Sequence, residues 1–156
     1  MKKLTLSLFV SLFAVFITQK SFAQDAKSQL EVTRSALQTM KQDVVSQAMN
    51  LTEEQSTVFW PLYREFQTAK ASLNDQSIKL IEDYAKSYDT ITDDEALALT
   101  KQFQSIQKQH LSLENKYIKK FQKVLPGKVV AKYFQTENKL EAIAKYDLAG
   151  SIPLIK

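Results

Sequence analysis

Apolar residues recur at every third or fourth position along most of this chain, which is the spacing that places them on one face of an α-helix. The spacing predicts four helices, over residues 27–48, 53–88, 92–124 and 127–149. Only two glycines and three prolines occur among the 156 residues, so few positions interrupt a helix. We therefore expect an all-α fold.

Within the predicted helices the apolar positions form continuous stripes. The stripe of the second helix consists of Phe59, Leu62, Phe66, Ala69, Leu73, Leu80 or Ile81, and Tyr84. The stripe of the third helix consists of Leu99, Phe103, Ile106, Leu113, Tyr117, Phe121 and Val124. The segment Leu125-Pro126-Gly127 separates the third helix from the fourth, and Gly150 is predicted to end the fourth helix as its C′ residue.

The second and third helices are long and are joined by a short turn at residues 89–91. At a rise of 1.5 Å per residue, a helix of about 35 residues is roughly 50 Å long, which exceeds the width of a compact domain of this size. The two helices are therefore expected to form an extended hairpin, with the first and fourth helices packed across or along it. Because such a hairpin exposes much apolar surface, we expect a second copy of the chain to cover it in a homodimer.

The N-terminus has the features of a secretory signal peptide. Met1-Lys2-Lys3 is basic, the stretch from Leu4 to Ile17 is almost wholly apolar, and Ser21-Phe22-Ala23 places small residues before a cleavage site. The apolar stretch is too short to favour a membrane-spanning helix. We therefore expect export to the periplasm with cleavage after Ala23, which leaves residues 24–156 as a single all-helical domain.

Export changes the charge of the mature protein. Lys2, Lys3 and Lys20 lie in the predicted signal peptide, so the 21 basic residues of the chain fall to 18, against 17 acidic residues. Export and this near balance of charge both disfavour nucleic-acid binding, and we expect no nucleic-acid partner. The sequence contains no cysteine, which excludes disulfides, thiol catalysis and cysteine-ligated metals.

The sequence offers few groups for catalysis or metal binding. His110 is the only histidine, so any catalytic pair of a nucleophile and a histidine would have to use this one residue. His110 and Glu114 are four residues apart on one helix face and are the best metal candidates, but two ligands within one chain do not complete a transition-metal site. A site shared across a dimer axis remains an alternative. We expect no enzymatic activity, no cofactor and no bound metal.

Two helix starts carry a recognisable capping pattern. The Thr52 hydroxyl is placed to accept from the backbone N–H of Gln55, whose side chain can reach back to the N–H of Thr52. Thr92 and Glu95 repeat this spacing at the start of the third helix. The first of these capping boxes lies in the segment Leu51-Thr52-Glu53-Glu54-Gln55.

This segment resembles the LTxxQ motif of the Spy/CpxP-like family of periplasmic proteins. In that family a second copy of the motif opens the last helix. Here the corresponding segment begins at Leu125, and the aromatic pair Tyr133-Phe134 follows it at the same spacing as in the first copy, but Pro126 and Val129 replace the threonine and the glutamine. The resemblance covers about residues 30–148 with one intact motif.

The resemblance implies a curved, all-helical, antiparallel homodimer whose concave face receives other proteins. It implies an ATP-independent chaperone (holdase) of the envelope stress response, which binds partly unfolded envelope proteins weakly. Two alternatives within the same resemblance are an adaptor that binds a membrane sensor protein and a protein that binds metal under metal stress. Leu51, Thr52 and Gln55 are then a helix cap and a family marker rather than a binding site.

The second part of the chain is the more basic one, because residues 114–156 hold 9 basic and 4 acidic residues. Cations and aromatic rings lie close together there, and a surface that mixes them can bind varied unfolded segments. The candidate binding surface consists of Lys116, Tyr117, Lys120, Phe121, Lys123, Lys128 and Lys132. The alternative is that the lysines form a solvated face that complements the helix dipole while the aromatic rings belong to the core.

The C-terminal tail, residues 151–156, is unusually apolar for a free terminus. We expect it to dock back against the helices. The alternative is a short peptide that binds a partner.

Overall fold

The computed structural model describes residues 35–155, apart from the side chain of Asp147. The predicted signal peptide and the predicted start of the first helix lie outside the described residues. Contacts within the chain divide it into two compact units, of which the first ends at Val44 and the second begins at Val45. Residues 35–44 of the first unit are helical, and the second unit contains three long helices. The all-α prediction is confirmed.

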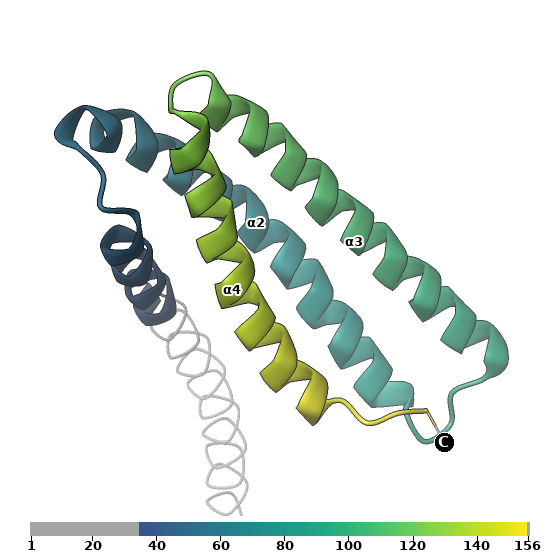
Figure 1. Cartoon of the computed structure of the whole chain (residues 1–156). Coiled ribbons are helices and arrows are strands. Elements are labelled where there is room, and N and C mark those ends of the chain that lie inside the picture. The colour runs from purple at the N-terminus through teal and green to yellow at the C-terminus, as the bar shows by residue number, and fades with distance from the viewer. Residues whose placement is uncertain (1–34, 156) are drawn as a thin grey trace, which may run out of the picture. The chain divides into compact units, whose positions relative to one another are not determined.

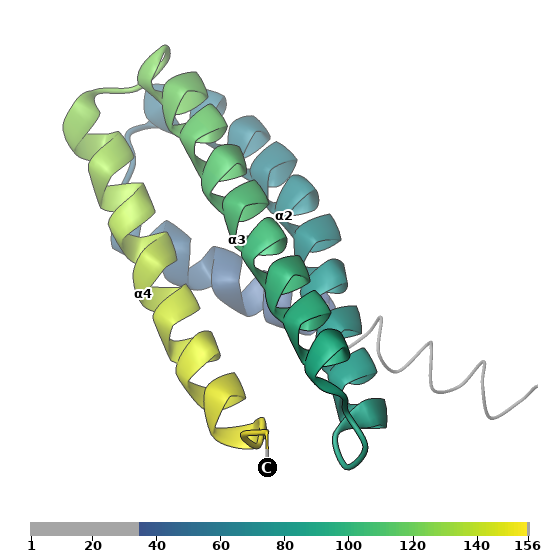
Figure 2. The same ribbon diagram turned by 90° about the vertical axis from the view of Figure 1, so that its right-hand side faces the viewer.

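The three long helices are α2 (Glu53–Ser87), α3 (Asp93–Gln122) and α4 (Gly127–Ser151). α2 and α3 form the predicted antiparallel hairpin, and α4 returns along it (Figures 1 and 2). Their bounds lie within two residues of those predicted from the sequence, and the helical residues 45–49 precede α2. None of the described helices is long and apolar enough to span a bilayer.

The ends of two helices differ from the sequence prediction. The helical residues 45–49 end at Asn50, whose φ of 46° lies in the left-handed region that asparagine tolerates better than most residues. The prediction that Gly150 ends the last helix is wrong, because α4 continues through it to Ser151. Pro153 explains the later end, since the residue before a proline avoids the helical region and Ile152 is extended, with φ −97° and ψ 114°.

The main core lies where α2 begins, α3 ends and α4 begins. Its centre is aromatic: Tyr133 packs edge-on against Phe59 and tilted against Phe121, with ring centroids 5.0 Å apart in both pairs. The buried residues of this core are Val45, Met49, Phe59, Tyr63, Phe66, Tyr117, Phe121, Leu125, Val130, Tyr133 and Phe134. Most of the predicted stripes are confirmed, but Phe103 and Val124 are exposed, and Tyr63 was missed.

α2 and α4 meet through side chains rather than through close backbones. In the described chain no Cα atom of α2 lies within 8 Å of a Cα atom of α4. Large side chains fill the space between them, including the rings of Phe66 and Phe134, whose centroids are 5.8 Å apart. The contact between these two helices therefore depends on a few long side chains, some of which are charged.

Candidate functional site

The residues of the LTxxQ-like segment form a helix cap. Thr52 Oγ1 accepts from the backbone N of Gln55 at 3.3 Å, and the Thr52 N–H donates to Gln55 Oε1 at 3.2 Å. Leu51 packs against the main core. The predicted capping box is confirmed, because Thr52 Oγ1, the Thr52 N–H and Gln55 Oε1 are all engaged at the helix start, as expected of a helix cap.

The second capping box is also confirmed. Thr92 Oγ1 accepts from the backbone N of Glu95 at 3.3 Å, and the Thr92 N–H donates to Glu95 Oε2 at 2.9 Å. This backbone hydrogen bond lowers the pKa of the Glu95 carboxyl, and the Thr92 hydroxyl adds to the effect. The Glu95 carboxylate at the start of α3 thus stabilises the N-terminus of this helix.

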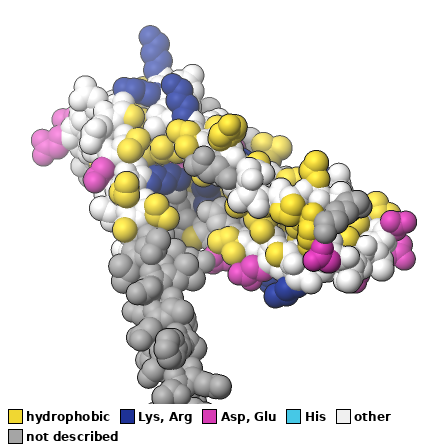
Figure 3. Space-filling view, turned by 90° about the horizontal axis from the view of Figure 1, so that it is seen from below, with side chains coloured by type: hydrophobic (Ala, Val, Ile, Leu, Met, Phe, Trp, Pro, Cys, Tyr) yellow, Lys and Arg dark blue, Asp and Glu magenta, His cyan; other side chains and the backbone are white. Residues whose placement is uncertain are grey.

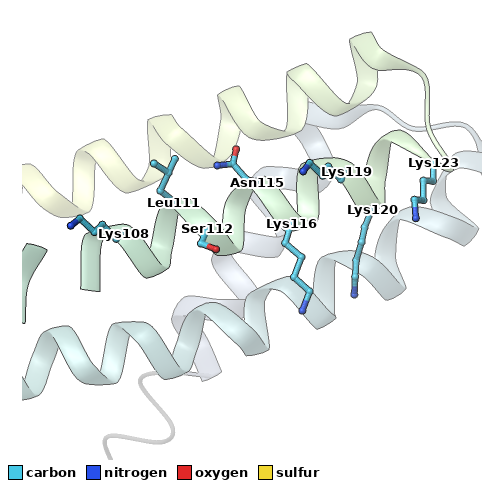
Figure 4. Close-up of a pocket in the computed structure, with 8 residues that line it drawn as sticks. All are labelled: Lys108, Leu111, Ser112, Asn115, Lys116, Lys119, Lys120 and Lys123. Atoms are coloured by element: carbon cyan, nitrogen blue, oxygen red, sulfur yellow. The ribbon is translucent and has the colours of Figure 1, made fainter. Parts of the chain in front are cut away.

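The lysines of α3 form an exposed surface, called the lysine patch below. It consists of Lys108, Lys116, Lys119, Lys120 and Lys123. Together with Leu111, Ser112 and Asn115 these lysines line an open groove of about 680 Å³ (Figure 4). Figure 4 shows Lys116 and Lys120 directed toward α2 and Leu111 directed toward α4. The described residues that line this groove all belong to α3 or to its C-cap, Lys123.

One carboxylate already lies on the lysine patch. Glu65 of α2 pairs with Lys120 at 2.6 Å, and 52% of the Glu65 side chain and 33% of the Lys120 side chain remain exposed. Hydrogen bonds from Lys120 and from Tyr117 lower the pKa of the Glu65 carboxyl. The Lys120 ammonium also lies 4.7 Å from the centroid of the Tyr117 ring, where the π face favours a cation.

The structure corrects part of the predicted binding surface. Tyr117 and Phe121 are buried in the main core, with 2% and 0% of their surface exposed, so they cannot contact a partner while the core is intact. Lys128 and Lys132 are exposed on α4, and Lys132 donates to the Met49 carbonyl at 3.3 Å. The lysines are thus a solvated face and the aromatic rings are core.

A second group of charged side chains is buried between α2 and α4. This buried polar cluster consists of Gln67, Lys70, Tyr133, Glu137 and Glu141. Lys70 Nζ lies 3.3 Å from Glu137 Oε1 and also pairs with Glu141. Gln67 Nε2 donates to Tyr133 Oη at 3.1 Å and to Glu137 Oε1 at 3.0 Å. Every fully buried side-chain polar atom in the described residues has a hydrogen-bond partner.

The burial of this cluster shifts the acidity of its members. Burial alone raises the pKa of the Glu141 carboxyl, but the ammonium groups of Lys70 and Lys145 lower it further than burial raises it. Burial raises the pKa of the Tyr133 hydroxyl, and the negative charge of Glu137 adds to this effect. The cluster therefore holds Glu141 as a carboxylate and Tyr133 as a neutral hydroxyl that can accept and donate hydrogen bonds.

His110 and Glu114, the predicted metal candidates, lie beside this cluster. They line a cavity of about 20 Å³ with Lys70, Glu137 and Glu141, a volume that fits one water molecule. Burial lowers the pKa of His110, Glu141 opposes this shift, and the cations Lys70 and Lys145 favour it. The Lys70 ammonium already supplies a positive charge to these carboxylates, and no group of three histidine or acidic residues suited to a metal occurs among residues 35–155.

Lys70 and Glu137 are 6% and 2% exposed, and neither is among the site residues predicted from the sequence. A signal for both was present. Lys70 follows Phe66 by four residues, and Glu137 follows Tyr133 by four, so each places a charge on the apolar stripe of its helix. Two opposite charges on two apolar stripes predict a buried pair, because neither charge is stable there alone.

The chain was compared with known proteins in three ways. Comparisons with protein families, with curated proteins and with solved structures give no match. The Spy/CpxP-like resemblance thus rests on the segment Leu51–Gln55 and on the order of the helices, and it stays a prediction.

Proposed function

We propose that this protein binds partly unfolded envelope proteins weakly and without catalysis, as an ATP-independent holdase of the periplasm. The lysine patch is the observation that carries this proposal. Its long flexible cations and the exposed Leu111 can adapt to segments of many shapes, whereas a rigid pocket selects one ligand.

Exposed apolar side chains elsewhere support the same proposal. On the face shown in Figure 3, hydrophobic side chains are exposed among polar and acidic ones. The large apolar residues exposed on α2, α3 and α4 are Ile78, Leu97, Phe103, Leu111, Ile143, Tyr146 and Leu148. They are spread over three helices rather than gathered in one pocket. Weak contacts at several places suit clients that have no fixed shape.

The test is suppression of aggregation by the mature protein, residues 24–156. Light scattering of an aggregating client is followed with increasing amounts of the protein, up to equimolar. We expect suppression that grows with the ratio and needs no nucleotide. If a folded sample does not suppress aggregation at any ratio of protein to client, the holdase proposal is wrong.

A second candidate function is an adaptor for one membrane sensor protein, and the C-terminal tail is the observation that favours it. The Pro153 carbonyl accepts from the Tyr84 hydroxyl at 2.9 Å, which supports the expected docking of the tail, yet Leu154 beyond it is 88% exposed. A segment that is held at Pro153 and exposes Leu154 can present this apolar side chain to a partner. Crosslinking in the envelope separates the two functions, because a holdase gives many products and an adaptor gives one.

Metal binding is the third function that the resemblance implies. Its test is calorimetry of the mature protein with zinc or copper, alongside the variant His110→Ala. A heat signal that the variant loses would establish the metal site. Homodimer formation is tested on the same samples by small-angle scattering, which distinguishes an elongated dimer from a compact monomer.

A further inference from the structure

The lysine patch carries positive charge that the described part of the chain does not neutralise. Residues 96–123, which comprise most of α3 and its C-cap Lys123, contain six lysines and a single carboxylate, Glu114. Glu114 lines the small cavity beside His110 rather than the groove. Within residues 35–155, Lys120 is the only lysine of the patch that forms an ion pair. The other four lysines are exposed. The patch is therefore complementary to a partner with several carboxylates.

The geometry of the patch fits an extended segment. Lys108 of α3 and Lys123 at its C-cap are 15 positions apart, which corresponds to about 22 Å at a helical rise of 1.5 Å per residue. An extended chain covers this length with about seven residues, at roughly 3.3 Å each. Leu111 lies between Lys108 and Lys116 and is 59% exposed, so it offers an apolar contact within the row of cations.

Glu65 shows how a carboxylate sits on this surface. Its carboxylate is held by the Lys120 ammonium at 2.6 Å, and Lys116 contributes further positive potential that lowers the pKa of Glu65. Both side chains of the pair are partly exposed to solvent. A carboxylate from another chain can be bound by Lys116, Lys119 or Lys123 in the same manner, because these side chains extend from the same helix and have no acidic partner of their own in the described chain.

We propose that the lysine patch selects acidic segments of its clients, in extended conformation and about seven residues long, that also carry an apolar side chain. The carboxylates bind the lysines and the apolar side chain packs against Leu111. The inference rests on the proposed holdase function, since it names the class of segment that this surface prefers.

The experiment measures binding of labelled peptides to the mature protein by fluorescence anisotropy. Three unstructured peptides of equal length carry the same leucines and differ only in the polar residues, which are glutamate, glutamine or lysine. We expect the glutamate peptide to bind about tenfold more tightly than the lysine peptide. High salt should remove most of this preference, because the pairs are exposed and are screened.

A pair of matched variants locates the preference. The first is Lys116→Gln, Lys119→Gln and Lys123→Gln together, which should abolish the difference between the peptides. The control is Lys79→Gln, Lys86→Gln and Lys139→Gln together, which changes the net charge equally at exposed positions outside the groove. The control variant should keep the preference.

The outcomes separate this inference from the proposed function. If the three peptides bind equally while aggregation is still suppressed, the inference is wrong and the holdase proposal stands. If the glutamate peptide binds to the patch but no client is protected, the holdase proposal fails and the surface preference stands. Two results would overturn the inference by assigning the patch another occupant. One is tighter binding to vesicles of anionic phospholipid than to any peptide, and the other is loss of peptide binding as the protein self-associates at higher concentration.

Discussion

Two lysine–glutamate pairs in this protein have the same chemistry and opposite surroundings. Lys70 and Glu137 pair at 3.3 Å between α2 and α4, with 8% and 2% of their side chains exposed. Lys120 and Glu65 pair at 2.6 Å between α3 and α2, with 33% and 52% of their side chains exposed. The shorter pair is the more exposed one, so distance alone does not rank their importance.

The two environments separate the charges that stabilise the fold from those that are available to a partner. A buried charge loses its hydration and must keep its partner, so removing one member of a buried pair costs far more than removing one member of an exposed pair. The buried polar cluster also bridges two helices whose backbones do not approach each other. The lysine patch lies outside the core, so its lysines can exchange their partners with water, salt ions or another molecule.

The largest expected effect is that of Lys70→Met. The substitution leaves Glu137 and Glu141 without their shared cation in a buried place, and we expect the free energy of unfolding to fall by about 3 kcal/mol. The measurement is urea unfolding followed by the fluorescence of Trp60, the only tryptophan, which packs edge-on against Phe59 with ring centroids 5.0 Å apart.

A matched control for Lys70→Met is Lys79→Met on the same helix. Lys79 pairs with Asp83 at 2.6 Å and is 68% exposed, so its loss should leave the unfolding midpoint unchanged. A triple variant in which Glu137→Gln and Glu141→Gln accompany Lys70→Met should recover part of the stability, since no charge is then left alone. Equal effects of the two lysine substitutions would contradict the difference between buried and exposed pairs.

The second effect is acid destabilisation that originates at the buried polar cluster. The folded pKa of Glu141 lies below its ordinary value of 4.5 and that of His110 below 6.5, so the unfolded chain binds protons first at both groups. At pH values above their ordinary pKa values, Glu141 and His110 both contribute to the free energy of unfolding. This contribution is lost as the pH falls below the ordinary pKa values and through the lowered pKa values of the folded state.

The measurement for this effect is the urea midpoint of residues 24–156 from neutral pH down to about 3. We expect the midpoint to fall first below pH 6.5, through His110, and then again below pH 4.5 as Glu141 and the other carboxylates with lowered pKa values are protonated. His110→Gln should remove the first fall and keep the second. A midpoint that stays constant until pH 4.5 in the unaltered protein would show that His110 is not linked to folding.

The smaller structural effects lie at the helix starts. Thr52→Ala removes one hydrogen bond of the first capping box, and we expect a loss of about 1 kcal/mol. Thr92→Ala should cost a similar amount at the tip of the hairpin, far from the main core. The thermal midpoints of both variants measure this loss. Thr52→Ser should keep the midpoint of the unaltered protein and Thr52→Val should lower it, which would assign the effect to the hydroxyl.

The sequence predicts the helices well because each is specified locally. The stripes, the two threonine caps and the break at Pro126 are all contained within short windows, and the bounds of α2, α3 and α4 follow from them. The buried polar cluster is only partly specified in this way: the apolar stripes mark Lys70 and Glu137 as buried charges, but the residues that meet across α2 and α4 are 66 to 71 positions apart, so no local pattern shows which of them pair. Local patterns also could not show that Tyr117 and Phe121 turn inward while their lysine neighbours stay in water.

The smallest expected effect on stability is that of Glu65→Gln, and it is the sharpest test of the exposed pair. The substitution frees Lys120 from its only carboxylate partner in the described chain, so the thermal midpoint should not change measurably, whereas Glu137→Gln should lower it clearly. The freed ammonium adds to the lysine patch, and the glutamate peptide should then bind more tightly while the lysine peptide does not. If Glu65→Gln instead destabilises the protein and leaves peptide binding unchanged, Lys120 stabilises the fold and does not belong to the part of the patch that binds a partner.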